Sequence, residues 1–159
     1  MWTWFAGWAG LLVSVLVTML AGGLAGIATG SSVSTWYSTI QRPSWTPPDG
    51  VFAPVWSALY ASMGVALWLA CRAKPAEAAV PVVVYAAQLG LNLLWSVLFF
   101  GLRRPDLAFA EIVLLWCAIL ATVVVFWRTT SWAGVLLLPY LLWVTFAAVL
   151  NGAIWRMNA

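Results

Sequence analysis

The chain has 159 residues, of which 65% are hydrophobic and only 7% are charged, and its formal net charge is +3. A soluble domain carries about 25% charged residues, so this chain could not cover a water-facing surface and must lie in lipid. The small positive excess, with no basic run longer than Arg103-Arg104, does not indicate a nucleic-acid partner. The composition predicts an integral, multi-pass membrane protein whose partner is the lipid bilayer, without indicating which membrane.

Five apolar stretches follow one another along the chain, and each is long enough to cross a bilayer as a helix. We expect these helices at about residues 4–28, 51–71, 80–101, 107–127 and 132–155. The last four are joined by short polar turns that contain charged residues or threonine and serine. The sequence therefore predicts a single all-α domain over residues 1–159, a bundle of five transmembrane helices.

In the first stretch, Gly22, Gly26 and Gly30 recur every four residues. A face of small residues at this spacing permits two helices to approach closely. The face could form the seam of a homodimer or pack against another helix of the same chain. We favour packing within the chain and keep the homodimer as the alternative.

The connection over residues 30–50 is the longest in the chain, and it contains three aromatic side chains, Trp36, Tyr37 and Trp45. These aromatic residues, together with several prolines, are not typical of a plain flexible linker. Loops of this length in compact domains are usually functional. We therefore expect this loop to contribute to a site.

The third stretch carries a stripe of aromatic and amide side chains. Its members, spaced three and four residues apart on one helical face, are Tyr85, Gln88, Asn92, Trp95 and Phe99. Lipid would penalise the two amides at this depth, so the face must point into the bundle. It serves either interhelical hydrogen bonds, worth about 0.6 to 2 kcal/mol each, or a ligand pocket with amide donors and aromatic walls. The stripe alone does not decide between them.

Two other stretches carry similar stripes. The residues are Trp56, Tyr60 and Met63 in the second stretch, and Tyr140, Trp143, Ala147 and Asn151 in the fifth. Ala147 is small and leaves room beside the Trp143 indole. Three helices that each present an aromatic and polar stripe suit a flat, apolar, conjugated ligand better than a narrow ion path.

Glu111 is the only acidic residue well inside a predicted span, about one turn from the start of the fourth stretch. Ionisable residues within a membrane are functional candidates by default. At this depth, however, the carboxylate can reach the lipid headgroups or pair with Arg103 or Arg104. We expect that pairing.

The composition also limits the chemistry. The chain has no histidine, which removes the commonest metal ligand and the commonest general base. No Ser/His/Asp set, pair of carboxylates or phosphate-binding loop is present. We predict no metal site and no required cofactor. Any chemistry would have to come from tryptophan or from the ligand itself.

Several short motifs occur together over about residues 35–158, in order. They are Trp45-Thr46-Pro47-Pro48, Val51-Phe52, Trp56 and Tyr60, then Ala87-Gln88, Asn92-Leu93-Leu94-Trp95 and Phe99-Phe100-Gly101, and finally Trp132-Ala133-Gly134, Pro139-Tyr140, Trp143, Leu150-Asn151 and Trp155-Arg156. Together they resemble the translocator protein family (TspO/MBR), also called tryptophan-rich sensory protein or peripheral benzodiazepine receptor.

The resemblance implies a five-helix bundle, often a homodimer, that binds porphyrins, sterols and benzodiazepine-type drugs between its helices. In this family the pocket lies under the first loop, here residues 30–50. Matching positions place Trp56, Asn92, Trp95, Trp143 and Ala147 in the pocket, with Trp45 and Pro47 in the lid. The stripes add Tyr60, Gln88, Phe99 and Tyr140 as ligand-binding candidates.

We therefore expect a protein that binds a hydrophobic small molecule, a tetrapyrrole such as porphyrin first, with a sensory or trafficking role. Residues 149–156 lack the tyrosine of the family's cholesterol-recognition stretch, so porphyrin ranks above sterol. One alternative is an enzyme that degrades protoporphyrin IX with light and oxygen, for which the resemblance implies Trp56 and Trp143 as catalytic residues. A second alternative is a small-molecule transporter, disfavoured by the odd number of spans and the nearly charge-free interior.

Overall fold

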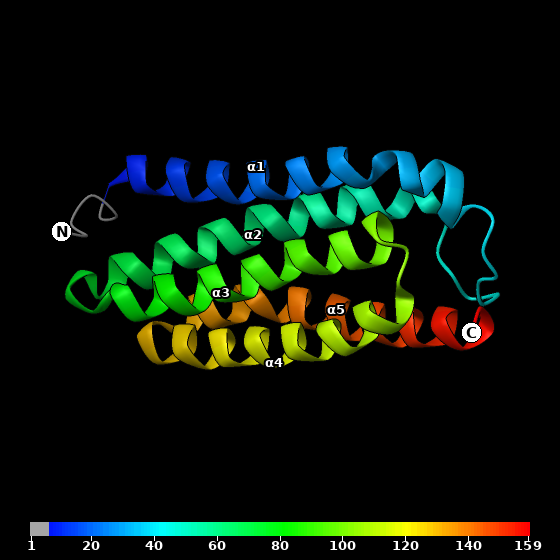
Figure 1. Ribbon diagram of the computed structural model, residues 1–159. Helices are drawn as coiled ribbons and strands as arrows, with labels where there is room; N and C mark the ends of the chain where they lie inside the picture. The colour runs from blue at the N-terminus through cyan, green and yellow to red at the C-terminus, as the bar shows by residue number, and fades with distance from the viewer. Residues whose placement is uncertain (1–6) are drawn as a thin grey trace.

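The computed structural model describes residues 7–159, which form five long helices packed side by side (Figure 1). They are α1 (Trp8–Ser32), α2 (Phe52–Ala73), α3 (Ala79–Ser96), α4 (Pro105–Thr129) and α5 (Ser131–Met157). Short helical turns adjoin them at η2 (Val33–Tyr37), η3 (Asp49–Val51), η4 (Pro75–Glu77) and η5 (Val97–Gly101). All five are long and apolar enough to cross a membrane. The protein is therefore an all-α, multi-pass membrane protein, as predicted.

Successive helices run in opposite directions, so α1 begins at one end of the bundle and α5 finishes at the other (Figure 1). α1 packs mainly on α2, whereas α4 packs on both α3 and α5. The interior is filled by side chains such as Met63, Ile112, Ile119, Phe126 and Tyr140, each less than 2% exposed. Outward-facing apolar residues surround this core, because the surrounding solvent is lipid.

α1 lies on the outside of the bundle and is held at its first half by close contacts. Gly64 of α2 faces it so closely that an added Cβ would lie 2.6 Å from Val15 Cα. The Thr18 hydroxyl is 2.6 Å from the Tyr85 hydroxyl of α3. A Cβ added to Gly22 would overlap the ring of Tyr60. The face of α1 that carries Gly22, Gly26 and Gly30 therefore packs against α2 of the same chain at Gly22.

The first helix extends further than the sequence suggested. α1 continues through η2 to Tyr37, so the loop expected over residues 30–50 is confined to Ser38–Pro48, before η3. Thr29, Thr35 and Ser38 each donate a hydroxyl to the carbonyl oxygen four residues earlier, at 2.8, 2.7 and 2.8 Å. These bonds satisfy the three hydroxyls locally, so the polar side chains do not prevent the segment from being helical.

The other four helices begin and end within two residues of their expected bounds when η5 is counted with α3. The expected start of the first helix, at about residue 4, lies outside the described residues.

Candidate functional site

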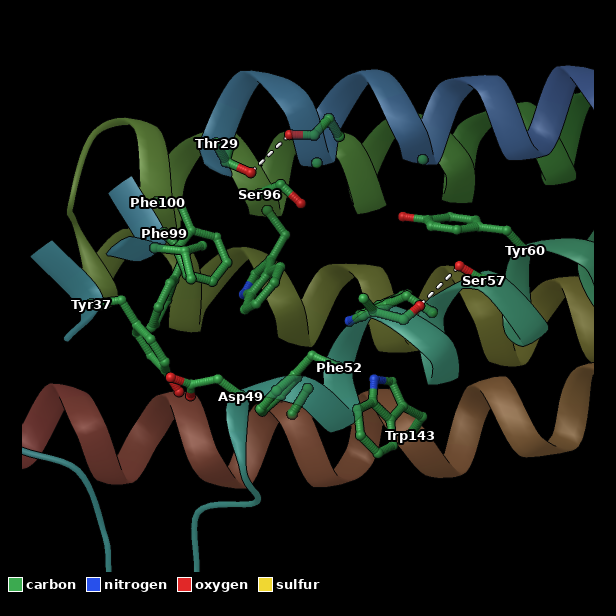
Figure 2. Close-up of a pocket in the computed structure, with 18 of the residues that line it drawn as sticks. Thr29, Tyr37, Asp49, Phe52, Ser57, Tyr60, Ser96, Phe99, Phe100 and Trp143 are labelled. Carbon is green, nitrogen blue, oxygen red and sulfur yellow. Dashed lines mark hydrogen bonds between the residues drawn. The ribbon is translucent and has the colours of Figure 1, made fainter. Parts of the chain in front are cut away.

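A cavity of about 450 Å³ lies between α1, α2, α3 and α5 (Figure 2). Its volume falls in the range of roughly 300 to 1,000 Å³ that is typical of small-molecule sites. Aromatic side chains make up much of the wall: Tyr37, Phe52, Trp56, Tyr60, Trp95, Phe99, Phe100 and Trp143. α1 closes the opposite side mainly with small residues, among them Gly22, Gly23, Ala25 and Gly26. The site is a mostly apolar chamber with one aromatic side and one small-residue side.

The aromatic rings brace one another. Trp56 and Tyr60, one turn apart on α2, stack with ring centroids 5.5 Å apart. Trp143 of α5 meets Trp56 edge to face at 6.5 Å and an interplanar angle of 90°. On α3, Trp95 stacks on Phe99 at 5.2 Å. Such pairs are worth about 0.5 to 1.5 kcal/mol beyond the area they bury, so the wall is held in a defined shape before any ligand arrives.

Two indole N–H groups at the cavity differ in their bonding. Trp95 donates its Nε1–H to Asn151 Oδ1 at 3.0 Å. Asn151 in turn donates Nδ2–H to the Pro105 carbonyl oxygen at 2.8 Å. The Nε1–H of Trp143 is buried and has no protein partner among the described residues. A buried donor without a partner costs free energy, and this one belongs to a residue that lines the cavity.

A buried chain of hydrogen bonds runs directly behind Tyr60. The Tyr60 hydroxyl donates to Asn92 Oδ1 at 2.6 Å, and Asn92 Nδ2–H donates to the Tyr140 hydroxyl at 3.0 Å. Tyr140 then donates to Gln88 Oε1 at 3.0 Å. The chain joins α2, α3 and α5 and fixes the Tyr60 ring against the cavity. For Gln88 and Asn92, therefore, the polar part of the stripe on α3 forms hydrogen bonds between helices, which was one of its two possible roles.

The structure brings six of the predicted ligand-binding residues to the cavity wall: Trp56, Tyr60, Trp95, Phe99, Trp143 and Ala147. Gln88, Asn92 and Tyr140 lie behind the wall, in the hydrogen-bond chain. The two predicted lid residues lie outside the cavity: Trp45 packs edge to face on Phe146 at 5.9 Å, and Pro47 lines a separate cleft of the loop.

Sequence reasoning missed the contribution of α1 to the cavity. Gly22, Gly23 and Gly26 line it, and no other atom would lie within 4 Å of a Cβ added at Gly23 or Gly26. The glycine spacing was visible in the sequence, but we interpreted it only as helix packing.

The loop over residues 38–48 is fastened at both of its sides. Arg42 forms an ion pair with Asp49 at 2.8 Å, and its guanidinium lies 4.8 Å from the centre of the Tyr37 ring. The pKa of Arg42 is raised, first by the adjacent Tyr37 side chain and then by Asp49. Gln41 exchanges two hydrogen bonds with Asn158 beyond α5, at 3.0 and 2.9 Å. These contacts hold the loop over the end of the bundle.

The expected pairing of Glu111 with Arg103 or Arg104 is wrong. Arg104 instead pairs with Asp106, at 2.6 Å. Glu111 is only 6% exposed, and neither of its carboxyl oxygens has a partner within residues 7–159. The reason is helical phase: Glu111 lies on the face of α4 that includes the buried Ala108, Ile112 and Leu115, which points away from the arginines.

The chain matches the TspO/MBR family over residues 14–156. It is 45% identical over 142 residues to the tryptophan-rich protein TspO of Chlorobaculum tepidum, covering 87% of this chain and 90% of that protein. It is 40% identical to the tryptophan-rich protein TspO of Archaeoglobus fulgidus, covering 93% and 97%. The translocator protein of Sus scrofa is 42% identical over 126 residues, covering 77% of this chain and 75% of that protein.

Proposed function

The chain belongs to the TspO/MBR family, and from this premise we propose that it binds a flat, hydrophobic ligand of the tetrapyrrole class in its aromatic cavity. The proposed biological role is sensory or in trafficking. The ligand occupies the chamber between α1 and the aromatic wall. It is held by stacking and by very few polar contacts.

The observation that carries this proposal is the combination of a braced aromatic wall with the unpaired indole N–H of Trp143, a residue of that wall. Conjugated macrocycles bury large, flat, apolar faces, and indole and phenyl rings offer matching surfaces for offset stacking. Trp143 Nε1–H has no acceptor among the described residues, so a ligand that turns the Trp143 ring toward the cavity would satisfy it with a carboxylate or carbonyl group. A ligand without an acceptor would leave this buried donor unpaired, at a cost of about 1 to 3 kcal/mol.

A titration with protoporphyrin IX, followed by quenching of tryptophan fluorescence in detergent and in the dark, tests the proposal. Wild type is compared with Trp143→Phe, which removes the unpaired donor and keeps an aromatic ring. Trp132→Phe is the matched control, because Trp132 is 71% exposed and does not line the cavity.

We expect saturable quenching in wild type and in Trp132→Phe, with the dissociation constant raised about tenfold in Trp143→Phe, the equivalent of one lost hydrogen bond. Quenching that never saturates and is equal in all three proteins would show that porphyrin only partitions into the micelle. In that case the aromatic stripes would serve packing between the helices and not ligand binding.

A second candidate function is light- and oxygen-dependent breakdown of the bound porphyrin. It is favoured by the contact between Trp56 and Trp143, both of which line the cavity. An indole beside a photoexcited macrocycle can donate an electron to it, and dissolved molecular oxygen supplies the oxidant. Illumination of the complex, with and without oxygen, tests this candidate through the loss of the porphyrin absorption band. Equal loss in wild type and in Trp143→Phe would remove Trp143 from the chemistry.

A further inference from the structure

Five residues that line the cavity are exposed. Asp49 lies on the loop side, and the other four lie on two neighbouring helices: Gly23 and Gly26 of α1, and Ala53 and Ser57 of α2. We call these four residues the lateral window. All four are small, and no other atom would lie within 4 Å of a Cβ added at either glycine. The space beside them is therefore continuous from the chamber to the surface.

The register of α1 and α2 places these residues opposite one another. The helices are antiparallel (Figure 1). Gly64 lies against Val15, and Tyr60 lies against Gly22. Continued along both helices, this pairing brings Gly23 and Gly26 to the level of Ser57 and Ala53. The tight glycine contacts end where the lateral window begins.

The other side of α1 packs against α3 and η5. Thr29 is buried there and Ser96 of α3 is half-buried, and both line the cavity (Figure 2). The bond between Thr18 and Tyr85 ties α1 to α3 one turn before the chamber. The gap between α1 and α2 is therefore the opening that the small residues leave beside the cavity.

The lateral window lies at the depth of the hydrocarbon core. Gly23 is near the middle of the continuous helical span Trp8–Tyr37, which has 30 residues. A helix of that length measures about 45 Å, and the hydrocarbon core of a bilayer is about 30 Å thick. The middle of the span therefore faces acyl chains, as do the exposed neighbours Leu20, Leu24 and Ile27.

We infer that the lateral window is the route by which the ligand passes between the bilayer and the cavity, an inference that rests on the proposed binding function. A flat hydrophobic molecule dissolved in the acyl chains reaches the chamber without crossing water. The loop side is the less accessible route, because Arg42–Asp49 and Gln41–Asn158 fasten it. The small side chains of the lateral window determine how thick a ligand can be and still pass between α1 and α2.

Binding kinetics in lipid nanodiscs test this route, with protoporphyrin IX as the probe and stopped-flow quenching as the readout. Ser57→Trp places a bulky ring at the lateral window from the outer, exposed side of α2. Leu16→Trp is the control, because Leu16 is exposed on the lipid side of α1 but does not line the cavity.

We expect the association and dissociation rate constants both to fall by at least tenfold in Ser57→Trp, even if the added ring, which also borders the cavity, changes their ratio. A barrier on the path slows both directions, whereas damage to the site alone would speed dissociation. Leu16→Trp should match wild type. Unchanged rates, or faster dissociation alone, would overturn the lateral route while leaving the binding function in place. The absence of saturable binding in wild type would overturn both.

A reversible block gives a second measurement on one protein. In a Cys117→Ala background, which leaves Cys71 buried, Ser57→Cys is modified in detergent at alkaline pH, where the thiolate forms, with a bulky methanethiosulfonate. Mass spectrometry verifies complete modification before reconstitution, and the adduct is then reduced. Modification should slow association at least tenfold, and reduction should restore the original rate. Rates that are equal before and after modification would contradict the inference.

Discussion

Tyr60 belongs both to the cavity wall and to the buried hydrogen-bond chain. Its ring stacks on Trp56, while its hydroxyl donates to Asn92 at 2.6 Å. The polar end is thereby satisfied inside the bundle and the apolar face is left for the cavity. In lipid, where no water can take its place, such a partner is needed to keep a tyrosine inward-facing. The chain behind the wall therefore determines the shape of the wall.

This arrangement predicts a graded loss of stability. Tyr60→Phe removes one bond of the chain and should lower the free energy of unfolding by about 1 kcal/mol. Tyr140→Phe removes two, because Tyr140 both accepts from Asn92 and donates to Gln88, and should cost about twice as much. Thermal melting in detergent measures the difference, with Ser34→Ala as a control that removes one exposed bond. Equal melting temperatures in all proteins would show that the chain contributes nothing to stability.

Glu111 presents the opposite case, a buried polar group without a partner. Burying such a group costs about 1 to 3 kcal/mol in proteins. We therefore expect Glu111→Leu, which keeps a similar volume, to raise the free energy of unfolding by about 1 to 3 kcal/mol. Denaturation in mixed micelles measures the change. Asp106→Asn is the control of opposite sign, because it breaks the exposed pair with Arg104. Loss of stability in Glu111→Leu would show that the carboxyl group has a partner not seen among the described residues.

At the scale of the helices, Gly64 of α2 and Gly90 of α3 have different roles. Gly64 permits contact with the backbone of α1, whereas Gly90 of α3 faces open space. Gly64→Ala should therefore push α1 away and destabilise the protein by about 1 to 3 kcal/mol, the usual cost of overpacking. Gly90→Ala should be neutral or stabilising by up to about 1 kcal/mol, since alanine is the better helix former. Melting curves of the two variants check this, and equal effects would contradict the packing role of Gly64.

The helices could be predicted from the sequence because their signal is long and redundant. Runs of more than twenty apolar residues, interrupted by Arg-Pro or Pro-rich turns, leave few alternatives for a chain in lipid. The end of the first helix was misplaced because Thr29, Thr35 and Ser38 look like loop residues. Their hydroxyl bonds to the preceding turn are a local solution that the residue types alone do not reveal.

The candidate site was less predictable than the fold. Spacing identified the inward face of α3, but it could not separate Trp95, at the cavity, from Asn92, in the hydrogen-bond chain one turn earlier. That distinction depends on which neighbouring helix each side chain meets. Glu111 shows the same limit, because its depth was foreseeable but its direction was set by the packing of α4 on α3 and α5.

At the scale of the whole molecule, the two sides of the cavity are built differently. On the loop side, polar contacts tie residues 38–48 to the rest of the protein, and Asn158 supplies two of them. On the lipid side, the lateral window is bordered by small residues without such ties. A mutation that loosens the loop should therefore leave the association rate of the ligand unchanged.

Asn158→Ala should release the loop without changing how fast the ligand arrives. Losing both bonds to Gln41 exposes that backbone to solvent, so amide hydrogen exchange over residues 38–48 should rise at least fivefold. Met157→Ala is the control, because Met157 is exposed and leaves the Asn158 bonds in place. The association rate of protoporphyrin IX in nanodiscs should stay within twofold of wild type, since the loop is not the route. Faster association that accompanies faster exchange would place the path at the loop instead, because only a gate on the path couples its own opening to the arrival of the ligand.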